Sequence, residues 1–173
     1  MGGSMRFSPK DKVVHPIHGA GVITEIAVKS ISGEPTECVV IKLMVGNAGI
    51  LLPTDSVEKT DLRFVVDKKS MQEALDVLSE KAEELPKDWR RRIETLKERV
   101  HSGDPGEVAK AVRDIIARSI NSKMNPSEKR VLSEAVGVLA GEVALVKEIK
   151  VSSAKSMIRR VAKTAQEAEQ EED

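Results

Sequence analysis

The feature that most constrains this fold is a change in hydrophobic period near residue 64. Before it, short Val- and Ile-rich runs such as "DKVVHP", "GAGVITEIAVKSI" and "ECVVIKLMV" are separated by Gly and Pro, which is typical of short β-strands. After residue 67, apolar residues recur at i, i+3, i+4 and i+7, the spacing of amphipathic helices. The sequence therefore predicts an α+β chain, with a small β domain followed by an all-α domain of about five helices.

The strand-rich part is short for its number of strands. About four or five strands in roughly 60 residues predict a strongly bent sheet or an SH3-like barrel. "SGEPTE" is typical of a hairpin loop, and "GAG" at residues 19–21 allows a sharp turn after the first strand.

Two segments of the helical part carry helix-start signals. "GDPGE" offers Asp104 as N-cap, with Pro in the first helical position and Glu at the third. "NPSEKR" repeats this arrangement, with Asn125 as the cap and Glu128 at the third position. A last helix is expected to begin near Ser152.

The predicted boundaries divide the chain into four segments. Residues 1–4, "MGGS" before a second Met, are interpreted as an expression scar. Residues 5–66 form the β-rich domain and residues 67–165 the helical domain. Residues 166–173, "QEAEQEED", are expected to form a disordered acidic tail.

The zero net charge conceals an uneven distribution. Residues 64–165 carry 21 basic and 16 acidic side chains, whereas residues 166–173 carry five acidic side chains and none that is basic. A basic surplus favours polyanionic partners. No apolar run reaches the length of a membrane span, and the single cysteine, Cys38, fits a reducing cytoplasm.

The candidates for chemistry are few. His15 and His18 in "HPIHG" could hold a metal only with further ligands, so turn geometry is the expected role, with no metal and no cofactor. Cys38 lies inside a predicted strand, and the chain has no GxSxG, P-loop or GxGxxG motif. We expect no enzyme, because a hydrolase would need Cys38 exposed beside one of these histidines.

The only Trp lies in "LPKDWRRR", residues 85–92. Its spacing places it on an apolar stripe with three later residues of the same predicted helix, which favours burial. Its place in the first turn favours exposure, since the side chain points back past the helix end. The three arginines are expected to face away from the stripe. The stripe consists of Trp89, Ile93, Leu96 and Val100.

An apolar side chain beside arginines suits entry into the minor groove of DNA or stacking on an unpaired base. Lys129 and Arg130 lie one turn into the helix capped by Asn125, where free backbone N–H groups also favour phosphate.

Several motifs carry a resemblance to a known family. "DKVVHPIHGAGVI" resembles the opening of the CarD/CdnL transcription regulators, which is shared with the polymerase-interacting module of transcription-repair coupling factor. "LPKDWRRR", "SGDPGEVAKAVRDI" and "SEKRVLSEAVGVLAGEVAL" resemble the helical domain of CarD, in the same order. The resemblance covers about residues 5–146.

The resemblance implies a regulator that is not an enzyme. Its Tudor-like domain would dock on the RNA polymerase β subunit, and its helical domain would contact promoter DNA at the upstream edge of the bubble. The Trp wedges into the minor groove there and hinders bubble collapse. By motif, this implies DNA contacts for Trp89, Arg91, Arg92, Lys129 and Arg130.

On the polymerase side, the resemblance implies Lys29, before the "SISGE" turn. It also points to Leu51, where the family often has a basic residue. The expected protein is a cytoplasmic, nucleoid-associated monomer. The alternative is a protein-interaction module whose helical domain binds another protein and whose Trp89 is buried in the core.

Overall fold

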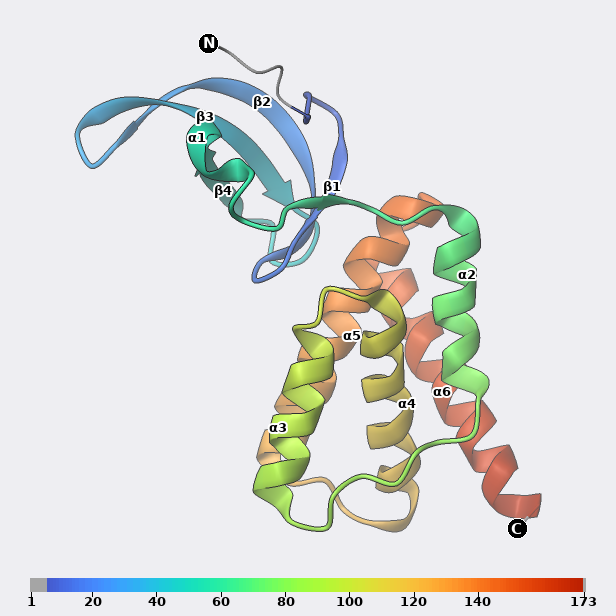
Figure 1. Cartoon of the computed structure of the whole chain (residues 1–173). Helices are drawn as coiled ribbons and strands as arrows, with labels where there is room; N and C mark the ends of the chain where they lie inside the picture. The colour runs from blue at the N-terminus through green and yellow to red at the C-terminus, as the bar shows by residue number, and fades with distance from the viewer. Residues whose placement is uncertain (1–5, 173) are drawn as a thin grey trace. The chain divides into compact units, whose positions relative to one another are not determined.

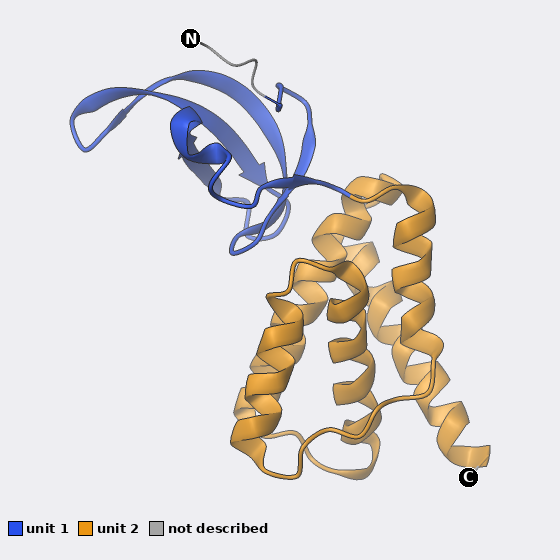
Figure 2. Ribbon diagram, in the orientation of Figure 1, with its two compact units in different colours: residues 1–65 blue, residues 66–173 orange. Residues whose placement is uncertain are grey.

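The computed structural model describes residues 6–172, so the expression scar predicted at residues 1–4 lies outside the described residues. The chain forms two compact units, residues 1–65 and 66–173 (Figure 2). The boundary predicted between residues 66 and 67 lies one residue from this division. In the described part, no helix is long and apolar enough to cross a membrane.

The first unit is a five-stranded antiparallel sheet in the order β4-β3-β2-β1-β5. Figure 1 labels strands β1 to β4 of this unit. One short helix, α1, follows β4. The bounds are β1 Lys12–His15, β2 Gly19–Ile31, β3 Glu34–Leu43, β4 Gly49–Pro53, α1 Thr54–Val57 and β5 Arg63–Phe64.

One face of this sheet builds the core. The strand register places Ile26 opposite Val39, and Val39 opposite Leu52, so the three side chains form one row across three strands. Val39 is fully buried, and the other two pack against the same apolar cluster. Because side chains alternate along a strand, the neighbouring row, which contains Leu51, lies on the opposite face.

The predicted turn after β1 is confirmed. Gly19 has a φ of 88°, a left-handed conformation that favours glycine. Gly21 serves a different purpose, because a Cβ there would lie 2.7 Å from both the Ile41 side chain and the Lys42 carbonyl oxygen. Glycine at this position therefore lets β2 and β3 approach closely.

The second unit is helical, and the α+β class with about five helices after a β domain is confirmed. Asp104 and Asn125 cap two of these helices through their side chains, as predicted. The bounds are α2 Lys68–Asp76, the 3₁₀ turn η1 Val77–Ser79, α3 Trp89–Val100, α4 Pro105–Asn121, α5 Pro126–Lys147 and α6 Val151–Glu172.

The prediction of a disordered acidic tail is wrong for residues 166–172, which continue α6. Gln166 is 2% exposed, and its Nε2 donates to the carbonyl oxygens of Leu78 and Glu80. Gln170 Nε2 donates to the Ala117 carbonyl oxygen. The two glutamines are four residues apart and share the inner face of the helix, while Glu167 and Glu171 are exposed.

Replacing Gln166 with Ala should destabilise the helical unit by about 1–3 kcal/mol, because two carbonyl groups lose their donor. The matched variant Glu167→Ala, at an exposed position, should stay within about 0.5 kcal/mol of wild type. Urea denaturation followed by circular dichroism measures both. Equal midpoints for the two variants would contradict a docked C-terminal turn.

Candidate nucleic-acid interface

Trp89 is the first residue of α3 and is 47% exposed. Asp88 caps the helix, with Oδ1 accepting from the backbone N–H of Arg91 at 3.0 Å. The Arg90 guanidinium carbon lies 5.3 Å from the centroid of the indole ring, a cation–π geometry. The indole is therefore presented to solvent, and the burial of Trp89 in the core that the alternative predicts is wrong.

The inner face of α3 is formed by Arg92, Leu96 and Val100, which are spaced four residues apart. The prediction that all three arginines face away from the apolar stripe is therefore wrong for Arg92. Leu96 and Val100 lie inward as predicted, and Ile93 is half-buried.

Arg92 is 5% exposed, and its donors are used inside the protein. Nε donates to Glu128 Oε1 at 2.5 Å, and Nη1 donates to the carbonyl oxygens of Pro86 and Lys87 at 2.8 and 2.9 Å. These bonds occupy the guanidinium that was predicted to contact phosphate. Arg92 is therefore held inside the protein by these bonds, whereas Arg91 is exposed to solvent.

The contact between Arg92 and Glu128 joins the first turns of α3 and α5, at one end of the helical unit (lower end in Figure 1). Lys129 and Arg130 follow Glu128 directly and are exposed. The fold thus brings Trp89 and Arg91 to the same end of the helical unit as the two basic residues of α5.

Glu128 is fully buried and belongs to a capping box. Its backbone N–H donates to Asn125 Oδ1, and its Oε2 accepts from the Asn125 backbone N–H, both at 2.8 Å. Burial acts to raise the pKa of Glu128, but the Asn125 N–H and the guanidiniums of Arg92 and Arg118 outweigh it. The pKa therefore lies below its ordinary value, and the side chain is an anion in the folded protein.

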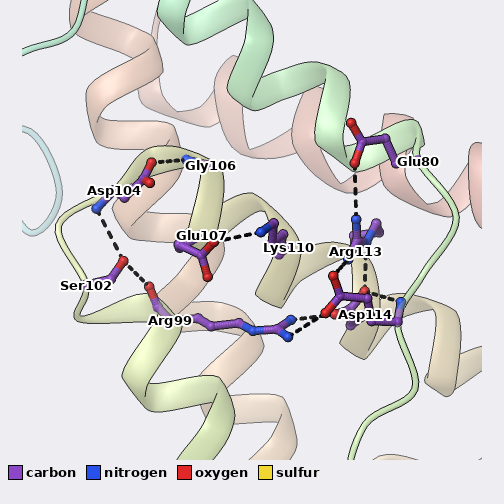
Figure 3. A network of polar contacts seen from close by, with 10 residues as sticks. Glu80, Arg99, Ser102, Asp104, Gly106, Glu107, Lys110, Arg113 and Asp114 are labelled. Atoms are coloured by element: carbon purple, nitrogen blue, oxygen red, sulfur yellow. Dashed lines mark hydrogen bonds and ion pairs between the residues drawn. The ribbon is translucent and has the colours of Figure 1, made fainter.

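A second buried carboxylate holds the segment that leads to α3. Asp114 Oδ1 accepts from the backbone N–H of Glu83 at 3.0 Å and from Arg113 Nε at 2.7 Å. Its Oδ2 accepts from Arg99 Nη1 at 2.5 Å, and Arg99 Nη2 pairs with Glu83. Figure 3 shows both guanidiniums directed toward Asp114. The chain before Trp89 is thus fixed to α4.

The sequence predicts only a capping role for Glu128 and no role for Asp114. The sequence does contain a signal that Arg92 faces inward. Arg92, Leu96 and Val100 are spaced four residues apart and so share one helical face, a pattern as regular as that of Trp89 and Ile93. No comparable signal exists for the ion pair itself, because its partners lie 36 residues apart.

In the β unit, Lys29 and Leu51 lie on the face opposite to the core. Glu25 stands opposite Val40, and Val40 stands opposite Leu51, so these side chains share one face. Lys29 lies on it too, four residues after Glu25, and its Nζ is 2.7 Å from Glu25 Oε1. Leu51 is 43% exposed on β4, an edge strand of the described sheet.

The histidines and the cysteine occupy structural positions. His15 is buried, and its Nδ1 accepts from the backbone N–H groups of Ile17 and His18. Burial and the neighbouring His18 lower the pKa of His15. Cys38 is fully buried, so it is not an accessible nucleophile. Within residues 6–172, no group of three or more His, Cys, Asp and Glu is placed to hold a metal ion.

The comparison with known proteins now decides the family. The family described as "CarD, C-terminal domain" matches residues 73–159, which is half of the chain. The chain belongs to the CarD family. A second match, "CarD-like/TRCF RID domain", covers residues 7–66.

A curated relative supports the same assignment. The chain is 27% identical over 150 residues to a protein of Bacillus subtilis (strain 168) named "Putative transcription factor YdeB". The alignment covers 87% of this chain and 98% of that protein. CarD-family proteins are transcription regulators rather than enzymes, and their N-terminal domain type interacts with RNA polymerase. The resemblance found in the sequence is thus confirmed.

Arg92→Ala should destabilise the helical unit by about 3 kcal/mol, because it removes a partner of the buried Glu128 carboxylate. The neighbouring Arg91→Ala variant, at an exposed position, should change stability by less than about 0.5 kcal/mol. Urea denaturation measures both, and equal stabilities would show that Arg92 is not held as described.

The contribution of Glu128 to stability should depend on pH. Since its pKa is lowered in the folded protein, the contribution is present above the ordinary value of about 4.3 and is lost as the pH falls through the folded value. The gap in unfolding free energy between wild type and Glu128→Gln should therefore be constant from about pH 7 to 5 and shrink below about pH 4. A constant gap down to pH 3 would contradict this assignment.

Proposed function

We propose that this CarD-family protein docks on the RNA polymerase β subunit through its β unit and contacts promoter DNA through the starts of α3 and α5. Trp89 enters the minor groove at the upstream edge of the transcription bubble and stabilises the open complex. The observation that carries this proposal is the exposed indole at the leading end of α3, at the same end as Lys129 and Arg130.

The DNA contacts divide into two kinds. Arg91, Lys129 and Arg130 are exposed cations that can neutralise phosphates without reading sequence. Lys87 and Arg90, also exposed near Trp89, add to the positive charge. The indole is an apolar wedge that fits an unstacked base step. It favours the distorted duplex over the closed one, and a differential of about 1.4 kcal/mol would change the ratio of open to closed complex tenfold.

Docking on polymerase explains how a chain of zero net charge can act on DNA. Once the β unit is bound, the DNA contact becomes intramolecular, so a weak intrinsic affinity is sufficient. The protein would then act as a monomer in the cytoplasm, at the nucleoid where polymerase is engaged.

The β4 edge is the surface that best suits the polymerase. It carries backbone groups that can pair with an added strand, and the exposed Leu51 side chain lies on the same face as the Glu25–Lys29 pair. We therefore place the polymerase contact on β4 and this face, with Leu51 making an apolar contact and Lys29 a polar one.

Trp89→Ala should shorten the half-life of the open complex about tenfold while changing the free energy of unfolding by less than about 1 kcal/mol, since half of the indole is already in water. Half-lives are measured by competitor challenge on a linear promoter, with binding to polymerase as the control. A large loss of stability with an unchanged half-life would contradict the proposal.

The variant Leu51→Asp should weaken binding to core polymerase about tenfold or more, because it places a desolvated charge in an apolar contact. Val45→Asp, at an exposed position outside the β4 strand, is the matched control and should bind as wild type does. Equal affinities for wild type and Leu51→Asp would move the polymerase contact elsewhere on the β unit.

A further inference from the structure

Glu128 is a carboxylate that connects three segments at the proposed DNA-contacting end. Its Oε2 accepts from the backbone N–H of Asn125, the N-cap of α5. Its Oε1 accepts from Arg92 of α3 and lies 2.9 Å from Arg118 Nη1 of α4. The side chain is 1% exposed, so both oxygens are satisfied within the protein rather than by solvent.

Arg92 carries this connection to the turn before Trp89. Its Nη1 donates to the carbonyl oxygens of Pro86 and Lys87, while its Nε stays on Glu128. A guanidinium is planar and rigid, so these bonds fix the direction of the turn relative to α5. The next residue is the cap, Asp88, and the one after it is Trp89.

Stability alone is a poor reason for this arrangement. A buried ion pair is often replaceable by apolar side chains of similar volume without loss, because desolvation offsets the attraction between the charges. What apolar side chains lack is direction. A wedge and its neighbouring phosphate contacts must be held within about 0.5 Å of the productive geometry, which directional bonds can achieve.

We propose that Glu128 is a positioning residue for Trp89. Through Arg92 it holds the turn at residues 86–88 and thereby fixes the indole relative to Lys129 and Arg130, so that the wedge and the phosphate contacts engage the same stretch of DNA. This role rests on the proposed function, because it has meaning only if Trp89 contacts DNA.

The test is a double-mutant cycle on the half-life of the open complex, with full-length protein and holoenzyme. Glu128→Gln should shorten the half-life about threefold or more, and should have no further effect in a Trp89→Ala background. Glu142→Gln is the matched control, since Glu142 is also a buried carboxylate of α5 but lies about 21 Å along the helix. It should leave the half-life unchanged.

A readout on the free protein separates positioning from folding. The fluorescence anisotropy of Trp89, the only indole, should fall in Glu128→Gln at a temperature where circular dichroism shows the helices intact. If this variant fails to fold, Arg92→Lys replaces it. This second variant leaves a cation beside Glu128 but cannot reach both that carboxylate and the carbonyl oxygens of residues 86 and 87, and the same dependence on Trp89 is expected.

The outcomes distinguish the two levels of the account. A wild-type half-life in both positioning variants, or an equal shortening with and without Trp89, would overturn the role of Glu128 and leave the proposed function standing. An unchanged half-life in Trp89→Ala would overturn the proposed function and the positioning role with it. Shortening that disappears in the Trp89→Ala background supports both.

Discussion

The buried ion pair between Arg92 and Glu128 is the interaction on which the organisation of one end of the helical unit depends, the end for which we propose DNA contact. This ion pair joins the first turn of α3 to the first turn of α5. Arg92 also donates hydrogen bonds to two backbone carbonyl oxygens and so holds the chain just before Trp89. A second buried carboxylate, Asp114, secures the earlier part of the same segment. The exposed indole is therefore presented by a turn fixed at several points.

The proposed function assigns a separate physical role to each kind of exposed group at the starts of α3 and α5. In the proposed function, phosphate contacts from Arg91, Lys129 and Arg130 supply affinity that is independent of sequence. In the same proposal, the indole supplies the preference for the distorted duplex over the closed one. Under this proposal neither the phosphate contacts nor the wedge need to bind strongly, since docking of the β unit on polymerase would convert DNA binding into an intramolecular step. A chain of zero net charge is then sufficient.

Much of the fold follows from the sequence because its signals are local. The change of period near residue 64 and the caps Asp104 and Asn125 act over a few residues. The prediction for Arg92 is wrong because its inward orientation depends on an acidic partner, Glu128, that lies 36 residues away in the sequence. The tail was mispredicted because overall acidity concealed the inward spacing of Gln166 and Gln170. Trp89 remained open because a first-turn position allows both burial and exposure.

The central claim is that Trp89 itself opens or holds a base step at the upstream edge of the bubble. The most direct measurement places 2-aminopurine at that step and records its fluorescence in open complexes with polymerase and saturating protein. The account predicts that wild type increases the fluorescence, because unstacking relieves quenching, whereas Trp89→Ala does not. Equal fluorescence with the two proteins would contradict it.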